Sequence, residues 1–157
     1  MKQEILNCSV SLTLTHYNEL PEVELYHNDQ KLNIDFKTQI SNNILNALTK
    51  HFLTTNSFNK EFKLTPLVGK QKIELIFKNS HLTNKTLAMQ TALTIRDLTI
   101  NNFRLSTRNI LLRNSKFYSN NRKIEQNIKE FPLFLRTDGK FIFEFETPFV
   151  TWAIKQF

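Results

Sequence analysis

The sequence is poor in the residues on which several common functional sites depend. Cys8 is the single cysteine in 157 residues, which excludes an internal disulfide and any zinc or iron–sulfur site built from several cysteines. Glycine occurs only at Gly69 and Gly139, so the glycine-rich loops that bind nucleotide phosphates are excluded as well. Low cysteine content is typical of a reducing environment. We therefore expect a cytoplasmic or other reducing intracellular location, and no cofactor.

Long apolar runs are also missing. No window of about 18 consecutive apolar residues occurs, so the sequence predicts no membrane span. The first residues, MKQEILNCSV, lack the apolar run of about 7 to 15 residues that a secretory signal requires. With 40% hydrophobic and 22% charged residues, the composition is that of a globular chain. We expect one domain over residues 1–157, because no linker-like segment interrupts it.

Positive charge is present in excess and is unevenly distributed. The formal net charge is +7, but 15 Lys and 18 Asn are a mixture that an AT-rich genome produces, so lysine alone is a weak indicator of function. Arginine is explained less easily in this way, and all six arginines lie between Arg96 and Arg136. Residues 96–140 carry +6 of the net charge. Such asymmetry indicates a polyanionic partner.

The hydrophobic pattern predicts several strands. Residues 4–17 alternate apolar and polar side chains, which is typical of a half-buried strand. Three further segments, residues 23–36, 61–78 and 133–147, each predict a hairpin. The last hairpin is expected to turn at Asp138–Gly139, a dipeptide that favours tight turns.

Three other segments predict helices. In residues 37–54 the apolar side chains recur at three- and four-residue steps, and residues 84–96 and 122–131 show weaker helical patterns. Strands are expected to follow the second of these. The predicted fold class is therefore α+β: a mostly antiparallel sheet built from hairpins, with two or three helices packed on one face.

Catalytic and metal sites have little support in the sequence. The histidines are scattered, and none forms the i, i+4 pair of a metal-binding helix. They are His16, His27, His51 and His81. Cys8 lies in a strand pattern, where it is expected to be a small buried hydrophobe.

Two acid pairs, Glu22 with Glu24 and Glu144 with Glu146, each share a strand face that is expected to be solvated. A small nuclease-like enzyme, with a base such as His16 or Glu144 near Arg136, is the weakest of three functional hypotheses, because no spacing favours it.

The basic segment supplies the leading hypothesis, a non-enzymatic protein that binds RNA or DNA phosphates or a ribonucleoprotein assembly. Guanidinium groups bind phosphate oxygens through two parallel hydrogen bonds, and nearby aromatic rings stack on unpaired bases. The candidate phosphate-binding residues are Arg96, Arg104, Arg108, Arg113, Lys116, Arg122, Lys123 and Arg136. The candidate stacking residues are Phe103, Phe117 and Tyr118.

The alternative is a subunit or adaptor of a protein complex, or an oligomer, that uses an aromatic surface and a basic strip to bind an acidic partner. Fourteen phenylalanines would supply such a surface if some of them are exposed. The placement of the arginines separates the two hypotheses. One positive face with Arg104, Arg108 and Arg113 favours nucleic acid, whereas scattered arginines, or arginines paired with Asp97 and Glu125, count against it.

Overall fold

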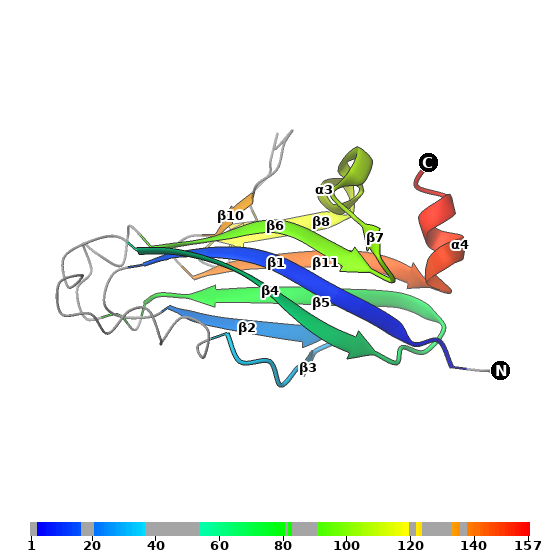
Figure 1. The fold of residues 1–157 in the computed structure, drawn as a ribbon, viewed down its shortest axis with the longest axis horizontal. Coiled ribbons are helices and arrows are strands. Elements are labelled where there is room, and N and C mark those ends of the chain that lie inside the picture. The colour runs from blue at the N-terminus through cyan, green and yellow to red at the C-terminus, as the bar shows by residue number, and fades with distance from the viewer. Residues whose placement is uncertain are drawn as a thin grey trace.

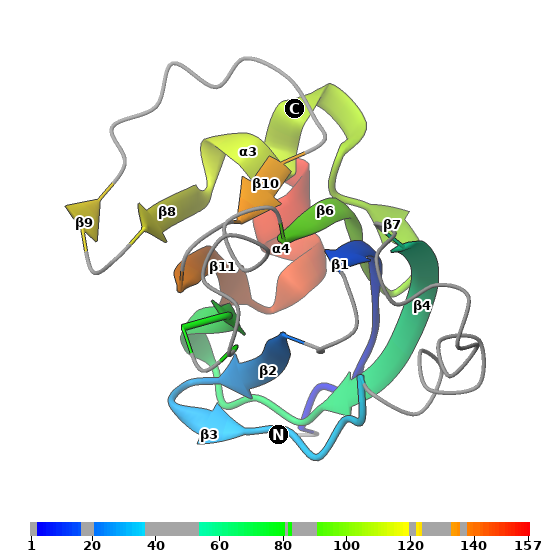
Figure 2. The same cartoon turned by 90° about the vertical axis from the view of Figure 1, so that its left-hand side faces the viewer.

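Two antiparallel β-sheets make up most of the described chain (Figure 1). The structure is a computed structural model, and it describes residues 3–16, 21–36, 54–80, 82, 91–119, 122–123, 133–135 and 138–157. Figure 2 looks along the strands and separates the two layers, with β6, β1 and β4 on one side and β2, β11 and β8 on the other. The described fold is therefore a β-sandwich.

Sheet A contains five described strands in the order β10-β6-β1-β4, with β7 paired to β6. Its central strand β1 (Leu6–His16) pairs with β4 (Thr54–Leu64) on one side and with β6 (Ala92–Ile100) on the other. The short strands β7 (Phe103–Arg104) and β10 (Leu133–Leu135) both pair with β6.

Sheet B contains six described strands in the order β3-β2-β5-β11-β8-β9, and all neighbours are antiparallel. These strands are β2 (Glu22–His27), β3 (Gln30–Lys31), β5 (Gly69–Lys78), β8 (Ser115–Ser119), β9 (Arg122–Lys123) and β11 (Gly139–Thr147). The longest of them, β5 and β11, lie at the centre of the sheet, where both of their edges are paired.

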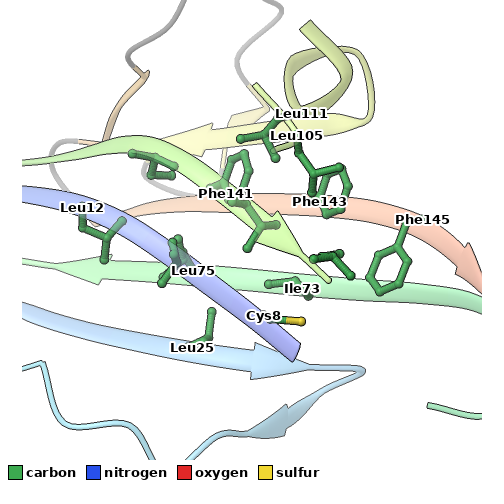
Figure 3. Packing of buried hydrophobic residues seen from close by; sticks show 14 of the residues in the cluster. Cys8, Leu12, Leu25, Ile73, Leu75, Leu105, Leu111, Phe141, Phe143 and Phe145 are labelled. Atoms are coloured by element: carbon green, nitrogen blue, oxygen red, sulfur yellow. The ribbon is translucent and has the colours of Figure 1, made fainter. Parts of the chain in front are cut away.

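The core lies between the two sheets because alternate residues of each strand are apolar and face inward. Sheet A contributes buried side chains such as Leu12, and sheet B contributes Leu75, Phe141 and Phe143 (Figure 3). The alternating phenylalanines of β11 are each at most 2% exposed. Strand alternation in the sequence therefore builds both layers of the sandwich.

Three short helical segments, η2 (Thr107–Asn109), α3 (Ile110–Arg113) and α4 (Phe149–Ile154), lie toward one end of the sandwich (Figure 1). α4 packs Trp152 into the core, with its ring centroid 5.9 Å from that of Phe143. No helix that the structure describes is long and apolar enough to cross a membrane.

The predicted fold class was wrong, because the described chain is mostly strand and the short helices among the described residues form no layer over a sheet. Residues 92–96, expected to end a helix, belong to β6, and residues 122–123, expected to begin one, form β9. In β6 nearly every side chain is buried, on both faces, so the period-2 pattern that identifies a strand is weak there. The predicted helix at 37–54 lies outside the described residues, apart from its last residue, which begins β4.

Two of the three predicted hairpins were also wrong. Residues 61–78 contribute to β4 and β5, and residues 133–147 to β10 and β11, but each pair of strands is divided between the two sheets. Asp138 has a positive φ of 50°, as a turn residue should, yet its Oδ1 accepts hydrogen bonds from the backbone N–H groups of Asn79 and Ser80. The turn therefore ties the start of β11 to the end of β5. The hairpin at 23–36 is confirmed as β2 and β3, and the strand at 4–17 as β1.

Candidate binding surfaces

The candidate basic residues are divided among separate parts of the sandwich. Arg96 on β6 and Arg104 on β7 belong to sheet A, whereas Arg108 and Arg113 lie on the helical segments beside α4. Lys116 lies on β8 of sheet B. The structure therefore does not bring these five side chains onto one face.

Three further candidates have side chains that lie outside the described residues. Arg122 and Lys123 form the edge strand β9, but their side chains are outside the described part of the molecule, and so is Arg136 altogether. Of the eight candidate phosphate-binding residues, the structure describes the side chains of five, and these five lie on separate elements.

Two of the predicted phosphate contacts are engaged with acids. Arg104 Nε donates to Asp97 Oδ2 at 2.7 Å, and Lys116 Nζ lies 3.0 Å from Glu144 Oε2. Pairing of an arginine with Asp97 is one of the outcomes that counts against a nucleic-acid strip.

The predicted stacking residues do not form a platform for bases. Phe117 is 4% exposed, and its ring centroid lies 5.1 Å from that of Phe141 in the core. Phe103 is partly buried and makes edge contacts with Phe149 at 6.2 Å and with Phe157 at 5.8 Å. Tyr118 is partly buried on β8, two strands away from β5. Phe103 and Phe117 therefore pack against other rings of the protein, and this leaves neither of them as a platform for a base.

Arg96 lies at an irregularity in the middle of sheet A. The register between β1 and β6 shifts there, because Ser11 is opposite Asp97 while the next residue, Leu12, is opposite Ile95. Arg96 is the extra residue, as in a β-bulge, and such bulges redirect side chains within a sheet. Its exposed side chain reaches the neighbouring strand, where Nε donates to Thr13 Oγ1 at 2.5 Å. The bulge therefore fixes a guanidinium over the outer face of sheet A.

Asp97 fixes the second guanidinium of this face. Asp97 is 6% exposed. Its carboxylate accepts hydrogen bonds from the backbone N–H groups of Leu98 at 2.9 Å and of Ser106 at 3.1 Å. The Ser106 hydroxyl adds a bond of 3.0 Å, and Arg104 Nε adds the ion pair. Four donors thus hold one carboxylate, which in turn orients Arg104, whose own side chain is 72% exposed.

These arginines border a shallow groove of about 460 Å³ on the outer face of sheet A. We call it the sheet A groove, and its lining residues are Ser9, Ser11, Asn59, Arg96, Asp97, Thr99 and Arg104. All of them are polar or charged. A neighbouring hollow of about 450 Å³ shares Ser9 and Thr99 with it and extends toward Lys63 and Asn102.

Exposed apolar side chains gather at one end of the sandwich. We call this set the end surface, and it consists of Ile5, Leu67, Val68, Val150, Ile154 and Phe157, each between 59% and 79% exposed. Hydrogen bonds join the segments that carry them: Phe149 N donates to Glu4 Oε1 at 3.1 Å, and Thr147 Oγ1 donates to the Leu67 carbonyl at 2.7 Å. In Figure 1 the starts of β1 and β5 and the end of β11 meet there, beside α4.

α4 divides its apolar side chains between the core and this surface. Phe149, Trp152 and Ala153 are buried, whereas Val150 and Ile154, four residues apart, are exposed. Hydrogen bonds from Gln156 N to Ala153 O at 3.0 Å and from Phe157 N to Ile154 O at 3.3 Å continue the helical turn. The exposed stripe thus runs along α4 to the ring of Phe157, which makes α4 apolar on both sides.

Two guanidinium groups border the exposed stripe. Arg113 Nη2 donates to the Gln156 carbonyl at 2.9 Å, and the Arg108 guanidinium carbon lies 4.7 Å from the ring centroid of Phe157. Lys155 is exposed on the same segment. On the strands that lead to this end, the positive charges of the exposed Lys63 and Lys70 are balanced by the negative charges of the exposed Glu61 and Glu146. The positive excess at this end therefore comes from the residues around α4.

The outer face of sheet B carries paired charges. Glu74 is 3% exposed and binds Lys72 Nζ at 2.7 Å and Lys140 Nζ at 2.5 Å. The pKa of Lys72 lies above its ordinary value, mainly because its ammonium group donates a hydrogen bond to Glu74 and, as the second cause, one to Asp29. The hydrogen bond from Tyr26 Oη, at 2.8 Å, lowers the pKa of Glu24. These lysines are engaged within the protein, so this face is a poorer candidate for binding an anion.

Cys8 is expected to be chemically inert in the folded protein. It is 4% exposed, and burial raises the pKa of its thiol from 9.0 to about 12. Because the thiolate is the nucleophile, alkylation by iodoacetamide at pH 8 should be about a thousandfold slower in the native protein than in urea. Mass spectrometry of the alkylated chain measures both rates. Equal rates would show that the thiol is accessible and reactive.

Sequence reasoning missed the end surface and the groove for different reasons. The end surface combines residues from three distant segments, and the signal that was present is the apolar run over both sides of a short helix in FVTWAIKQF. The groove depends on the bulge in β6. Before the bulge the inward-facing residues are Leu93 and Ile95, and after it they are Leu98 and Ile100. The step from 95 to 98 is three residues, whereas a regular strand repeats every two. The pair of polar residues in LTIRDLTI marks that shift.

The sequence matches no protein-family model and no curated protein, and the fold matches no solved structure.

Proposed function

We propose that the protein is a non-enzymatic subunit or adaptor that binds an acidic, amphipathic segment of a protein partner through the end surface. The observation that carries this proposal is the gathering of six strongly exposed large apolar side chains at one end of the sandwich. Large exposed apolar patches on a folded protein mark interaction sites, since each side chain gains free energy when a partner removes it from water. A buried free thiol such as Cys8 fits a reducing intracellular compartment.

The charges around α4 favour an acidic partner. Arg108, Arg113 and Lys155 border the exposed stripe, and carboxylates on a partner would pair with them at the rim of the interface. Arginine and aromatic residues are enriched in protein interfaces, and Arg108, Arg113 and Phe157 supply both types here. The apolar stripe supplies affinity, and the basic border selects a partner of opposite charge.

A second copy of this chain fits the end surface less well. In a two-fold symmetric dimer the same patch occurs on both sides, so the three cations of one copy would face the three cations of the other. The formal net charge of +7 also opposes self-association. The proposal is therefore a complex with a different, acidic chain.

Nucleic-acid binding stays a prediction, now on fewer residues. The arginines beside α4 contact Gln156 and Phe157, and the two phenylalanines expected to stack on bases pack inside the protein. Arg96 and Arg104 remain as a pair on sheet A.

Binding of designed peptides tests the proposed function. The probe is a fluorescein-labelled helical peptide with a leucine stripe flanked by glutamates, compared with the same peptide carrying lysines in place of the glutamates. Fluorescence anisotropy should show binding of the glutamate peptide about tenfold tighter than binding of the lysine peptide, which corresponds to about 1.4 kcal/mol. A serine double variant, Val150→Ser with Ile154→Ser, should lose binding while keeping the unfolding curve of the wild type.

Two charge variants serve as a matched pair. The double variant Arg108→Gln with Arg113→Gln should lower the affinity for the glutamate peptide by about 2- to 30-fold, because two ion pairs at the rim contribute about 0.2 to 1 kcal/mol each. Arg96→Gln with Arg104→Gln removes the same charge from sheet A and should leave this binding unchanged. Equal affinity for both peptides contradicts the proposal. So does a dimer, seen by light scattering, that the serine variant dissociates.

A further inference from the structure

The sheet A groove contains two guanidinium groups that the fold holds in place but does not neutralise completely. Arg96 and Arg104 each use Nε for an internal hydrogen bond, to Thr13 and Asp97 respectively. Neither shows a hydrogen bond from Nη1 or Nη2 to any residue that the structure describes. Both side chains are exposed. Each guanidinium therefore presents its two outer nitrogens to solvent in a fixed orientation.

The acid in the groove does not cancel this positive charge. Asp97 is the one carboxylate among the groove-lining residues, against two guanidiniums. Its oxygens already accept four hydrogen bonds, two of them from backbone N–H groups of Leu98 and Ser106. Asp97 is therefore a positioning residue for Arg104, and the groove keeps an excess of one positive charge.

The remaining lining groups are short polar side chains. Ser9, Ser11 and Thr99 supply hydroxyl donors, and Asn59 supplies an amide. Hydroxyl, amide and guanidinium groups are those that bind phosphate oxygens and position a polynucleotide backbone. The groove lining includes no aromatic ring, so it contains nothing on which a base would stack.

We propose that the sheet A groove binds a phosphate group through Arg96 and Arg104, with the neighbouring hydroxyls as further donors. The planar fork of each guanidinium matches two oxygens of a tetrahedral phosphate, and the β-bulge together with Asp97 sets the two forks before the ligand arrives. A phosphate in this groove belongs either to a polynucleotide backbone, bound without regard to sequence, or to a small phosphorylated molecule. The site is independent of the partner proposed for the end surface.

The test uses the full chain and three probes: inorganic phosphate, a labelled oligothymidylate and a labelled DNA duplex. NMR should show inorganic phosphate shifting the amide signals of residues 96–99 and 104–106. If the source is a polynucleotide, anisotropy at physiological salt should give a Kd of roughly 10⁻⁴ to 10⁻⁶ M, and the affinity should increase as the salt concentration is lowered. If the source is a small molecule, phosphate produces the shifts and neither polynucleotide binds.

Variants separate a built site from general positive charge. Arg96→Gln with Arg104→Gln should abolish the phosphate-induced shifts and, where a polynucleotide binds, lower the salt slope by about 1.4 to 1.8 for two lost contacts. Arg96→Lys with Arg104→Lys keeps the charge but loses the forks, and should bind several-fold more weakly than the wild type. Arg108→Gln with Arg113→Gln is the matched control and should bind phosphate as the wild type does.

Three results would overturn the proposal. The first is that no probe shifts residues 96–99 or 104–106. The second is that both glutamine double variants lose the same affinity. The third is that the lysine variant binds as tightly as the wild type, which would make net charge the sole cause. Urea unfolding of each variant shows that it is folded before binding is compared.

Discussion

Phe143→Ala is expected to destabilise the protein by about 3 to 5 kcal/mol, the usual cost of removing a buried aromatic ring. Phe143 is fully buried, and its ring lies 5.7 Å from that of Phe145 and 5.9 Å from that of Trp152. It therefore joins sheet B to α4. Because a whole domain is stable by only about 5 to 15 kcal/mol, the variant should lose a large fraction of its stability at 25 °C.

Urea unfolding followed by tryptophan fluorescence measures this change, since Trp152 contacts the altered site. Phe157→Ala is the matched control, because it removes the same ring from a residue that is 61% exposed. It should cost about 1 to 2 kcal/mol, because the exposed ring loses little burial and gives up only its edge contact with Phe103 and its contact with the Arg108 guanidinium. Similar losses for the two variants would contradict the assignment of Phe143 to the core and Phe157 to the end surface.

Asp97→Ala is expected to cost about 2 to 4 kcal/mol, which is unusually large for an acid at a sheet surface. The substitution leaves the nearly buried N–H groups of Leu98 and Ser106 without their acceptor, and each such loss costs about 1 to 3 kcal/mol. It also releases Arg104 from its ion pair. Thermal or urea unfolding at pH 7 measures the change.

Asp97→Asn separates the charge from the hydrogen bonds. Asparagine keeps an oxygen that accepts from Leu98 and Ser106 but loses the ion pair with Arg104, so about half of the destabilisation should be recovered. The ion pair alone contributes modestly, because Arg104 is 72% exposed and solvent screens the attraction. An alanine variant as stable as the wild type would show that Asp97 does not organise this part of sheet A.

Local pattern was sufficient to predict strands but not their partners. The alternation in residues 4–17 and 139–147 is real, since β1 and β11 bury every second side chain. A turn signal says only that the chain bends, and Asp138 shows the limit. Its positive φ is that of a turn, but the strands before and after it in the chain, β10 and β11, belong to different sheets. Which strands pair depends on contacts between distant residues, such as β1 with β4 and β5 with β11.

The helical prediction at 84–96 was wrong in its described part, for a related reason. The part that the structure describes, residues 92–96, lies in β6, whose outer side chains Ala92 and Thr94 are buried along with the inner ones. Burial on both sides removes the alternation on which strand recognition depends. Threonine and isoleucine content, which favours strands, was the better guide here.

The candidate site could be predicted only in part. Clustering of arginine in the sequence drew attention to Arg96 and Arg104, which share a groove, but it also joined them to Arg108 and Arg113, which lie beside α4. The turn after β7, at residues 105–106, lies between Arg104 and the helical segments that carry Arg108 and Arg113. Sequence proximity therefore overstated the continuity of the charge.

The most direct test of the proposed function is a two-dimensional amide NMR titration of the protein with the glutamate-flanked leucine peptide. We predict that the amides of residues 4–6, 67–69, 108–113 and 149–157 shift together and saturate, while those of Ser9, Ser11, Arg96 and Thr99 do not move. Shifts confined to sheet A, or no saturable shift at the end surface, would contradict the proposal that this surface binds an acidic partner.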